Sequence, residues 1–328
     1  MNSIISMNSV CKSYNINEGK GTILERLFCG RYKKIEAVKD ISLKIMPGEI
    51  VGYIGPNGAG KSTTIKLMTG IITPDKGEIK ILGDNPQNKR KEIAKKIGVV
   101  FGQKSQLWWD IPVIDTYRLL KEIYKIEEEM FGKTINKLDE ILDIKELLYI
   151  PVRQLSLGQR MKCDIVASLL HEPSILFLDE PTIGIDTVTK TQLRRFIRKI
   201  NKELNTTIVL TTHDMQDIVS TCERMILVNQ GVLIYDGKIS SFIENNHCYK
   251  QISFDLEINQ VEISDLLEMN YIRDVFINER HYTVIEFDDT IKSAMDIYNM
   301  ISSKFDFKDF AVLEESIESI IENYVKGM

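Results

Sequence analysis

The chain has 328 residues and a formal net charge of −5. This length is typical of about two domains, and the acidic balance excludes an overall basic surface of the kind that binds nucleic acid without sequence preference. The five cysteines are scattered without a C-x-x-C pair, and the four histidines add no metal-ligand spacing, which favours a reducing compartment. No stretch approaches about 18 consecutive apolar residues, and the N-terminus lacks the pattern of a signal peptide, so we expect any membrane-spanning part to belong to another chain.

The first expected elements are two strands separated by a polar insertion. Residues 3–10 have the pattern of a strand, and a second apolar segment covers residues 37–45. Between them, residues 15–34 are polar and contain three glycines, which indicates a surface insertion.

A phosphate-binding pattern, G-x-x-x-x-G-K-[ST], follows a short apolar strand at 49–54 and opens a helix. Glycines allow the backbone to wrap its N–H groups around phosphate oxygens, and the helix N-terminus adds a positive dipole. Lys61 brings a charge to the β- and γ-phosphates, and the Ser62 hydroxyl is suited to ligate Mg²⁺. The pattern therefore predicts a nucleotide site formed by Gly55, Pro56, Asn57, Gly58, Ala59, Gly60, Lys61, Ser62 and Thr63.

Beyond the phosphate loop, the sequence predicts a strand at 78–82 and a buried strand that ends at Gln103. Both tryptophans of the chain, Trp108 and Trp109, follow in an expected loop. The pair is interpreted either as part of the core or as an aromatic anchor for a partner. Residues 113–148 have apolar positions at helical spacing, and Pro151 ends this segment.

Two carboxylates end a second buried strand. Residues 174–178 are mostly apolar and lead into Asp179 and Glu180, as in a parallel strand that delivers acids to its carboxyl end, where ligands bind. With the phosphate loop present, Asp179 is suited to hold Mg²⁺ and Glu180 to take a proton from an attacking water. Upstream, Ser156 is a plausible cap for the helix predicted at 162–170, and downstream His213 follows an apolar strand at 207–210.

In order and spacing, these segments resemble the nucleotide-binding subunits of ABC transporters over about residues 4–240. The resemblance implies an α/β fold of the P-loop NTPase type with a helical subdomain at about residues 104–170. It also implies a set of named motifs. These are a Walker A loop (55–63), a Q-loop glutamine (Gln103), a signature (155–159), a Walker B strand (175–180), a D-loop (181–186) and a switch histidine (His213).

The resemblance also implies a role for each residue that meets the phosphates. Glu180, His213 and Gln103 are the expected catalytic residues, with Glu180 activating water and His213 positioning the γ-phosphate. Ser62, Gln103 and Asp179 are the expected ligands of Mg²⁺.

In the family, the signature reaches the ATP held by a second copy of the chain. The residues expected to do so here are Ser156, Gly158 and Gln159, and Asp186 ends the D-loop. The signature departs from the family pattern at Leu157, where glycine is usual. Because the serine and the next glycine are kept, we expect ATP binding to survive the change, and the effect of Leu157 stays open.

An aromatic residue stacks on adenine in this family, and two tyrosines are candidates. Tyr14 fits its local surroundings, whereas Tyr32 stands at the family's usual distance before the phosphate loop. We therefore prefer Tyr32 and keep Tyr14 as the alternative.

The resemblance implies ATP and Mg²⁺ as cofactors, a homodimer, and two membrane-spanning permease chains that hold the ATPase at the cytoplasmic face of the cell membrane. Residues 101–103, 107–110 and 152–155 resemble the branch that contains daunorubicin and viologen exporters, which implies export of a drug-like or hydrophobic compound. The alternative is a soluble ABC ATPase that acts on ribosomes or DNA. A single phosphate loop without sustained heptads speaks against it, and we expect no nucleic-acid partner.

The pattern of predicted strands and helices changes after the first domain, which we expect to cover residues 1–240. Strands are predicted at 252–258, 275–277, 282–287 and 310–313, and helices at 291–303 and 314–324. Residues 247–328 are therefore expected to form a small α+β domain.

Overall fold

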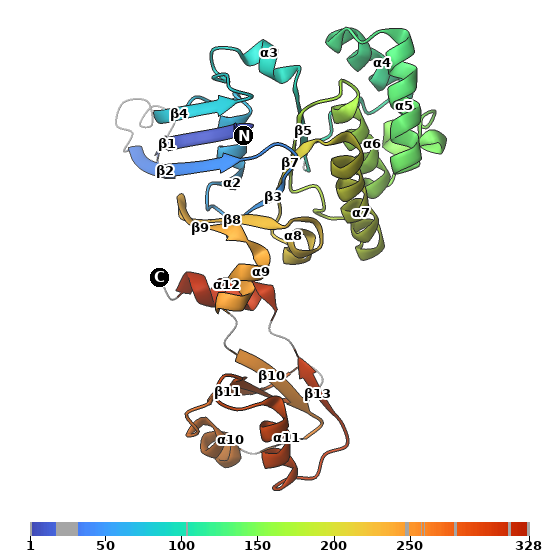
Figure 1. Ribbon diagram of the computed structural model, residues 1–328. Helices are drawn as coiled ribbons and strands as arrows, with labels where there is room; N and C mark the ends of the chain where they lie inside the picture. Colours follow the sequence, from blue (N-terminus) through green and yellow to red (C-terminus); the bar gives the residue numbers. More distant parts are fainter. Residues whose placement is uncertain are drawn as a thin grey trace. The chain divides into compact units, whose positions relative to one another are not determined.

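The computed structural model describes residues 2–17, 32–102, 104–246, 249–256, 258, 260–278, 281–313 and 316–326. The chain divides into two compact units, Met1–Ile239 and Ser240–Met328. Both units are shown in Figure 1.

The first unit is built on a sheet that has, in its described residues, six strands in the order β5-β6-β7-β3-β8-β9. Neighbouring strands are parallel except β9, which is antiparallel to β8. β6 and β7 are buried along their whole length, as expected for strands covered on both faces. The strands are β3 (Ile50–Ile54), β5 (Ile97–Phe101), β6 (Ile175–Asp179), β7 (Thr207–Thr211), β8 (Arg224–Asn229) and β9 (Val232–Lys238).

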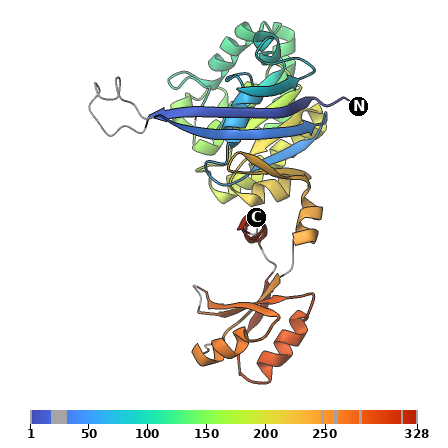
Figure 2. The ribbon, with the colours of Figure 1, turned by 90° about the vertical axis from the view of Figure 1, so that its left-hand side faces the viewer.

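A second, antiparallel sheet has the order β2-β1-β4, with β1 at Ile5–Asn17, β2 at Tyr32–Ile45 and β4 at Lys76–Ile81. Figure 2 shows β1 and β2 as two long strands lying side by side. Both are longer than the sequence predicts, because their polar ends pair as an exposed ribbon that carries no apolar signal. The predicted insertion at 15–34 is wrong at its edges, where the chain is still paired, and residues 18–31 lie outside the described part.

Some helices cover the parallel sheet, and others form a separate group beside it (Figure 1). The segment predicted at 113–148 is two helices, because the chain turns through a left-handed Lys125 between them. α6 begins at Leu157, five residues before the predicted start, since Ser156 caps it directly. The helices are α2 (Lys61–Met68), α3 (Arg90–Ala94), α4 (Val113–Tyr124), α5 (Glu128–Leu142), α6 (Leu157–Leu169), α7 (Thr187–Leu204) and α8 (Met215–Thr221), with short 3-10 turns η1 (Lys145–Leu147) and η2 (Val152–Gln154).

The second unit contains an antiparallel sheet in the order β11-β12-β10-β13. With its helices it follows the β-α-β-β-α-β order of a ferredoxin-like fold. Its core gathers Ile252, Phe254, Ile285 and Phe287 from the two central strands. The sequence missed α10, and it extended the first strand beyond its end at Phe254. The elements are α9 (Ile239–Asn246), β10 (Tyr249–Phe254), α10 (Gln260–Leu267), β11 (Ile272–Ile277), β12 (Thr283–Asp288), α11 (Ala294–Ser302), β13 (Phe310–Leu313) and α12 (Ile317–Lys326).

Candidate nucleotide site

Three adjacent parallel strands, β3, β6 and β7, end at the same edge of the sheet. The phosphate loop follows β3, the carboxylates Asp179 and Glu180 end β6, and His213 follows β7. Residues far apart in the sequence are therefore brought to one place by strand order alone, as is usual at the carboxyl edge of an α/β sheet.

The phosphate loop is held so closely by its neighbours that two of its glycines cannot carry a side chain. A Cβ on Gly55 would lie 2.1 Å from the carbonyl oxygen of Val228, and one on Gly60 would lie 2.2 Å from that of Ala37. Gly60 also has φ of 101°, a left-handed conformation that favours glycine. No side chain caps α2 at this residue, so the helix N-terminus faces the loop as an anion site.

Lys61 lies inside this loop. Its side chain is 6% exposed, and its ammonium group donates to the carbonyl oxygens of Gly55 at 2.7 Å and Pro56 at 3.1 Å. Burial lowers the pKa of Lys61, while the carboxylates of Glu180 and Asp179 act in the opposite direction. The loop thus encloses a positive charge within its own backbone.

A hydroxyl and a buried carboxylate converge beside the loop. The Ser62 Oγ donates to Oδ1 of Asp179 at 3.3 Å, and the Thr211 hydroxyl donates to the same oxygen at 2.5 Å. Oxygen ligands of this kind are those that Mg²⁺ prefers, so the residues present fit the ion. Gln103, the third expected ligand, lies outside the described residues. A cavity of about 350 Å³ opens here, lined by Ser62, Lys66, Ile71, Phe101, Gly102, Lys104, Asp179 and Glu180.

Glu180 and His213 approach each other across this edge. The Nδ1 of His213 lies 3.9 Å from Oε1 of Glu180, whose side chain is 20% exposed. Glu180 has φ of 54°, a left-handed conformation unusual for a residue with a Cβ, and its N–H donates to the backbone oxygen of Thr211 at 2.9 Å. A Cβ on Gly102 would lie 1.9 Å from the carbonyl oxygen of Glu180, so the segment before Gln103 packs directly on this turn.

Sequence reasoning missed Thr211 and Gly102. The threonine was visible at the end of a predicted strand, but its partner depends on the register that sets Asp179 opposite Thr211.

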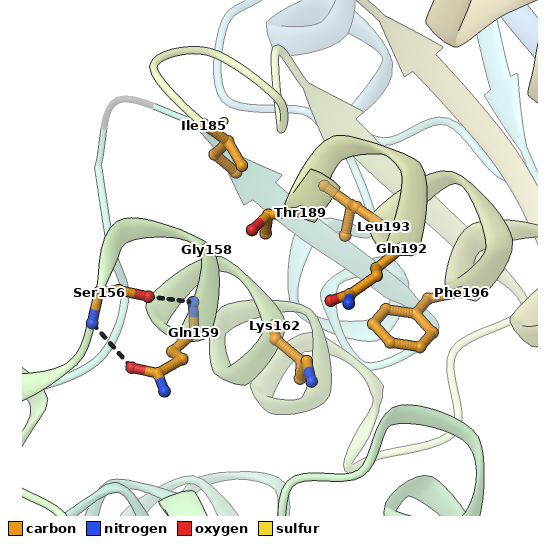
Figure 3. A pocket seen from close by; sticks show the side chains of 9 residues that line it. All are labelled: Ser156, Gly158, Gln159, Lys162, Ile185, Thr189, Gln192, Leu193 and Phe196. Atoms are coloured by element: carbon orange, nitrogen blue, oxygen red, sulfur yellow. Dashed lines mark hydrogen bonds between the residues drawn. The ribbon is translucent and has the colours of Figure 1, made fainter. Parts of the chain in front are cut away.

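The signature lies at the N-terminus of α6. Ser156 caps the helix by accepting from the N–H of Gln159 at 3.2 Å, and the Gln159 side chain accepts from the N–H of Ser156 at 2.9 Å (Figure 3). This reciprocal pair is a capping box, so Gln159 holds the serine in place. A Cβ on Gly158 would lie 2.3 Å from Cγ2 of Thr189, which means that α6 packs against the first turn of α7.

The unusual Leu157 contacts the D-loop. A Cβ on Gly184, which has φ of 72°, would lie 3.1 Å from Cδ2 of Leu157. Asp186 then caps α7 by accepting from the N–H of Thr189 at 3.0 Å and from its hydroxyl at 2.6 Å, and these bonds lower the pKa of Asp186. Leu157 thus packs against the segment that leads to Asp186.

A second cavity, of about 220 Å³, lies between α6 and α7 (Figure 3). Its lining comes from the signature, the following turn of α6, the D-loop and α7, and consists of Ser156, Gly158, Gln159, Lys162, Ile185, Thr189, Gln192, Leu193 and Phe196. It shares no lining residue with the cavity at the phosphate loop. Within one chain, the signature and the phosphate loop therefore face separate spaces.

The structure leaves both adenine candidates open. Tyr14 is 38% exposed on β1, with the ammonium of Lys12 at 5.9 Å from its ring centre. Tyr32 begins β2, but its side chain lies outside the described residues. The preference for Tyr32 stays a prediction.

The comparisons with known proteins agree with this geometry. A family model described as ABC transporter matches residues 38–183. NatA, an ABC transporter ATP-binding protein of Bacillus subtilis, is 30% identical over 224 residues, which cover 68% of this chain and 91% of NatA. The chain belongs to the family of ABC transporter ATP-binding proteins.

Other relatives of this ABC ATPase differ in what their names say they transport. The methionine import ATP-binding protein MetN 2 of Enterococcus faecalis is 30% identical over 256 residues, 75% of this chain and 74% of the relative. The bacitracin transport ATP-binding protein BcrA of Bacillus licheniformis is 30% identical over 261 residues, 78% of each chain.

Solved structures match the ABC ATPase as well. A dimeric ATP-binding cassette in a post-hydrolysis state with ADP and phosphate has a TM-score of 0.60 and 26% identity, covering 72% of this chain and 98% of that one. The predicted family, the α/β P-loop NTPase fold and the ATPase class are thus confirmed. Across the described residues of the ABC ATPase, no helix combines the length and the apolar character needed to cross a membrane.

Proposed function

We propose that this ABC ATPase binds ATP with Mg²⁺ at the phosphate loop and completes the site with the signature of a second copy. The separation of the two cavities within one chain carries this proposal. The helix N-terminus behind Lys61 supplies half of an anion shell, and the N-terminus of α6 at Ser156 and Gly158 supplies the other half from the partner copy. ATP then joins two copies face to face in a homodimer.

In the assembled site, Glu180 acts as the general base for the attacking water, and His213 positions the γ-phosphate. The 3.9 Å between the Nδ1 of His213 and the Oε1 of Glu180 supports a role for both at one reacting group. Ser62, Asp179 and Gln103 would hold Mg²⁺, which would supply charge neutralisation for the phosphate oxygens. Lys61 holds a further positive charge against the phosphates, where a preorganised site gains most from it.

The ATPase would power export of a drug-like or hydrophobic compound through two membrane-spanning permease chains, at the cytoplasmic face of the cell membrane. The similarity to the bacitracin transport protein supports a drug-like compound, and the similarity to the methionine importer keeps import as the alternative direction. Trp108 and Trp109 are 61% and 53% exposed, which favours the reading of this pair as an anchor for a permease.

The substitution Glu180→Gln tests the site. It removes the base while keeping the size of the side chain, so hydrolysis should slow by about 10² to 10⁴ with ATP still bound. Phosphate release, binding of a fluorescent ATP analogue, and molar mass in solution with saturating Mg-ATP measure these effects. Glu78→Gln, at an exposed glutamate paired with Lys80, is the matched control.

Normal turnover in Glu180→Gln would refute the assignment of the base. A variant that binds ATP and stays monomeric, even with its membrane partner present, would refute the dimer. Co-purification with a polytopic membrane protein, rather than co-sedimentation with ribosomes, separates the transporter from a soluble ATPase that acts on ribosomes or DNA.

A further inference from the structure

A buried carboxylate lies behind the candidate site and is not among the residues expected to meet ATP. Asp217, on α8, is 1% exposed. Its Oδ2 accepts from the hydroxyls of Thr182 at 2.5 Å and Thr212 at 2.9 Å, and its Oδ1 accepts from Nε of Arg194 at 2.6 Å. We call Asp217 and these three partners the polar junction.

The partners of Asp217 come from three segments that carry expected site residues. Thr182 is two residues after Glu180, and Thr212 directly precedes His213. Arg194 lies on α7, the helix that Asp186 caps. A single side chain therefore connects the turn of the general base, the loop of the switch histidine and the helix after the D-loop.

A second carboxylate strengthens this arrangement. Asp214 accepts from the ammonium of Lys190 at 2.7 Å and from Arg194 at 3.4 Å, and its other oxygen caps α8 at the N–H of Gln216. The N–H of Asp214 donates to the Thr212 hydroxyl at 3.0 Å, so this threonine hydroxyl both accepts and donates. The Thr212 hydroxyl therefore links the backbone of Asp214 to the Asp217 carboxylate.

The hydrogen-bond donors around a buried carboxylate can move little. Each hydrogen bond that is lost leaves part of the buried negative charge uncompensated, which is energetically costly. At 3.9 Å, the His213 Nδ1 and the Glu180 Oε1 are too far apart for a hydrogen bond, so their separation depends on the segments behind them. The polar junction connects those segments through side chains, beside the backbone hydrogen bond from the Glu180 N–H to the Thr211 oxygen.

We propose that Asp217 is a positioning residue for ATP hydrolysis, which holds the turn after Glu180 and the loop before His213 in one geometry. This inference rests on the proposed function, since it concerns the rate of the same reaction. Asp217 acts through Thr182 and Thr212 and does not itself contact the substrate.

The two threonine hydroxyls give the sharpest test. Thr182→Val and Thr212→Val keep the shape of the side chain and remove the donor, whereas Thr182→Ser and Thr212→Ser keep the donor. If the junction sets geometry, each valine variant should lower kcat about 10- to 100-fold with KM for ATP unchanged, and each serine variant should restore most of it. The double valine variant should lose less than the product of the two single losses, because both act through one carboxylate.

Thr221→Val is the matched control. Thr221 lies on the same helix, is 6% exposed, and its hydroxyl finds no hydrogen-bond partner in the part of the chain that the structure describes. This variant should hydrolyse ATP at the rate of the unmodified chain.

The possible results separate this inference from the proposed function. If the unmodified chain does not hydrolyse ATP, the proposed function fails. If it does, and Thr182→Val and Thr212→Val match it in kcat, the positioning role is refuted. An equal fall in kcat in the serine variants would also refute the positioning role. So would an equal fall in Thr221→Val, since in either case the loss of activity would reflect altered packing.

Discussion

Replacing Asp164 by asparagine should stabilise the protein at neutral pH. Asp164 lies on α6, is 3% exposed, and its Oδ1 accepts from the Ser105 hydroxyl at 3.0 Å and from the N–H of Gln106 at 2.9 Å. Burial raises the pKa of Asp164 to about 6, although the bonds from Ser105 and Gln106 act against the rise. At pH 7 the folded chain therefore holds a charged carboxylate in a place that favours the neutral form.

The size of the effect follows from the two pKa values. Because one pKa unit corresponds to about 1.4 kcal/mol, a rise from 3.8 to about 6 corresponds to about 3 kcal/mol. The folded state binds this proton more tightly than the unfolded state, so the contribution of Asp164 to stability is greatest below about pH 4 and declines as the pH rises to about 6. Asparagine keeps an oxygen for both hydrogen bonds and carries no charge. Asp164→Asn should therefore match the unmodified chain at low pH and exceed it by about 3 kcal/mol at pH 7.

Denaturant and thermal unfolding of both proteins from about pH 4 to about pH 7 would measure the difference, which amounts to roughly 6–12 °C in Tm for a unit of this size. Asp115→Asn serves as the control, because Asp115 is 43% exposed on α4 and pairs with Arg118 at the surface. A difference that stays constant over this pH range, or that favours aspartate at pH 7, would refute the reasoning.

Two further predictions concern the contact between α6 and α7 and the exposed tryptophans. Gly158→Ala brings a methyl group against Cγ2 of Thr189 and should lower ATP turnover at least about tenfold. Adding Thr189→Ser, which removes that methyl group and keeps the hydroxyl bonded to Asp186, should recover most of the rate, and no recovery would contradict the steric cause. Replacing Trp108 and Trp109 together by alanine should leave ATP binding unchanged and weaken co-purification with the permease, whereas unchanged association would exclude that contact.

Much of the candidate site could be predicted because its residues belong to short contiguous motifs. Residues 55–63 require glycines at fixed positions for the backbone to enclose an anion, and Asp179 and Glu180 end an apolar strand. Such requirements are local, so they remain readable without knowledge of the neighbours.

Less could be predicted where the local signal was weak. The paired ends of β1 and β2 are polar and exposed, so they lack the alternation that identifies a strand. In the second unit, the sequence indicated each of the four described strands in the sheet and missed α10, which connects β10 to β11.

The sequence by itself determined that this chain has a phosphate loop, a pair of acids at a strand end and a capped signature helix, because each depends on residues next to one another. Only the tertiary structure decided which side chains support them. Thr211 reaches Asp179 across 32 positions, and Thr182 reaches Asp217 across 35. These contacts depend on the order and register of the strands and on how α8 packs against them. The sequence around a hydroxyl residue does not indicate which distant carboxylate it will bind.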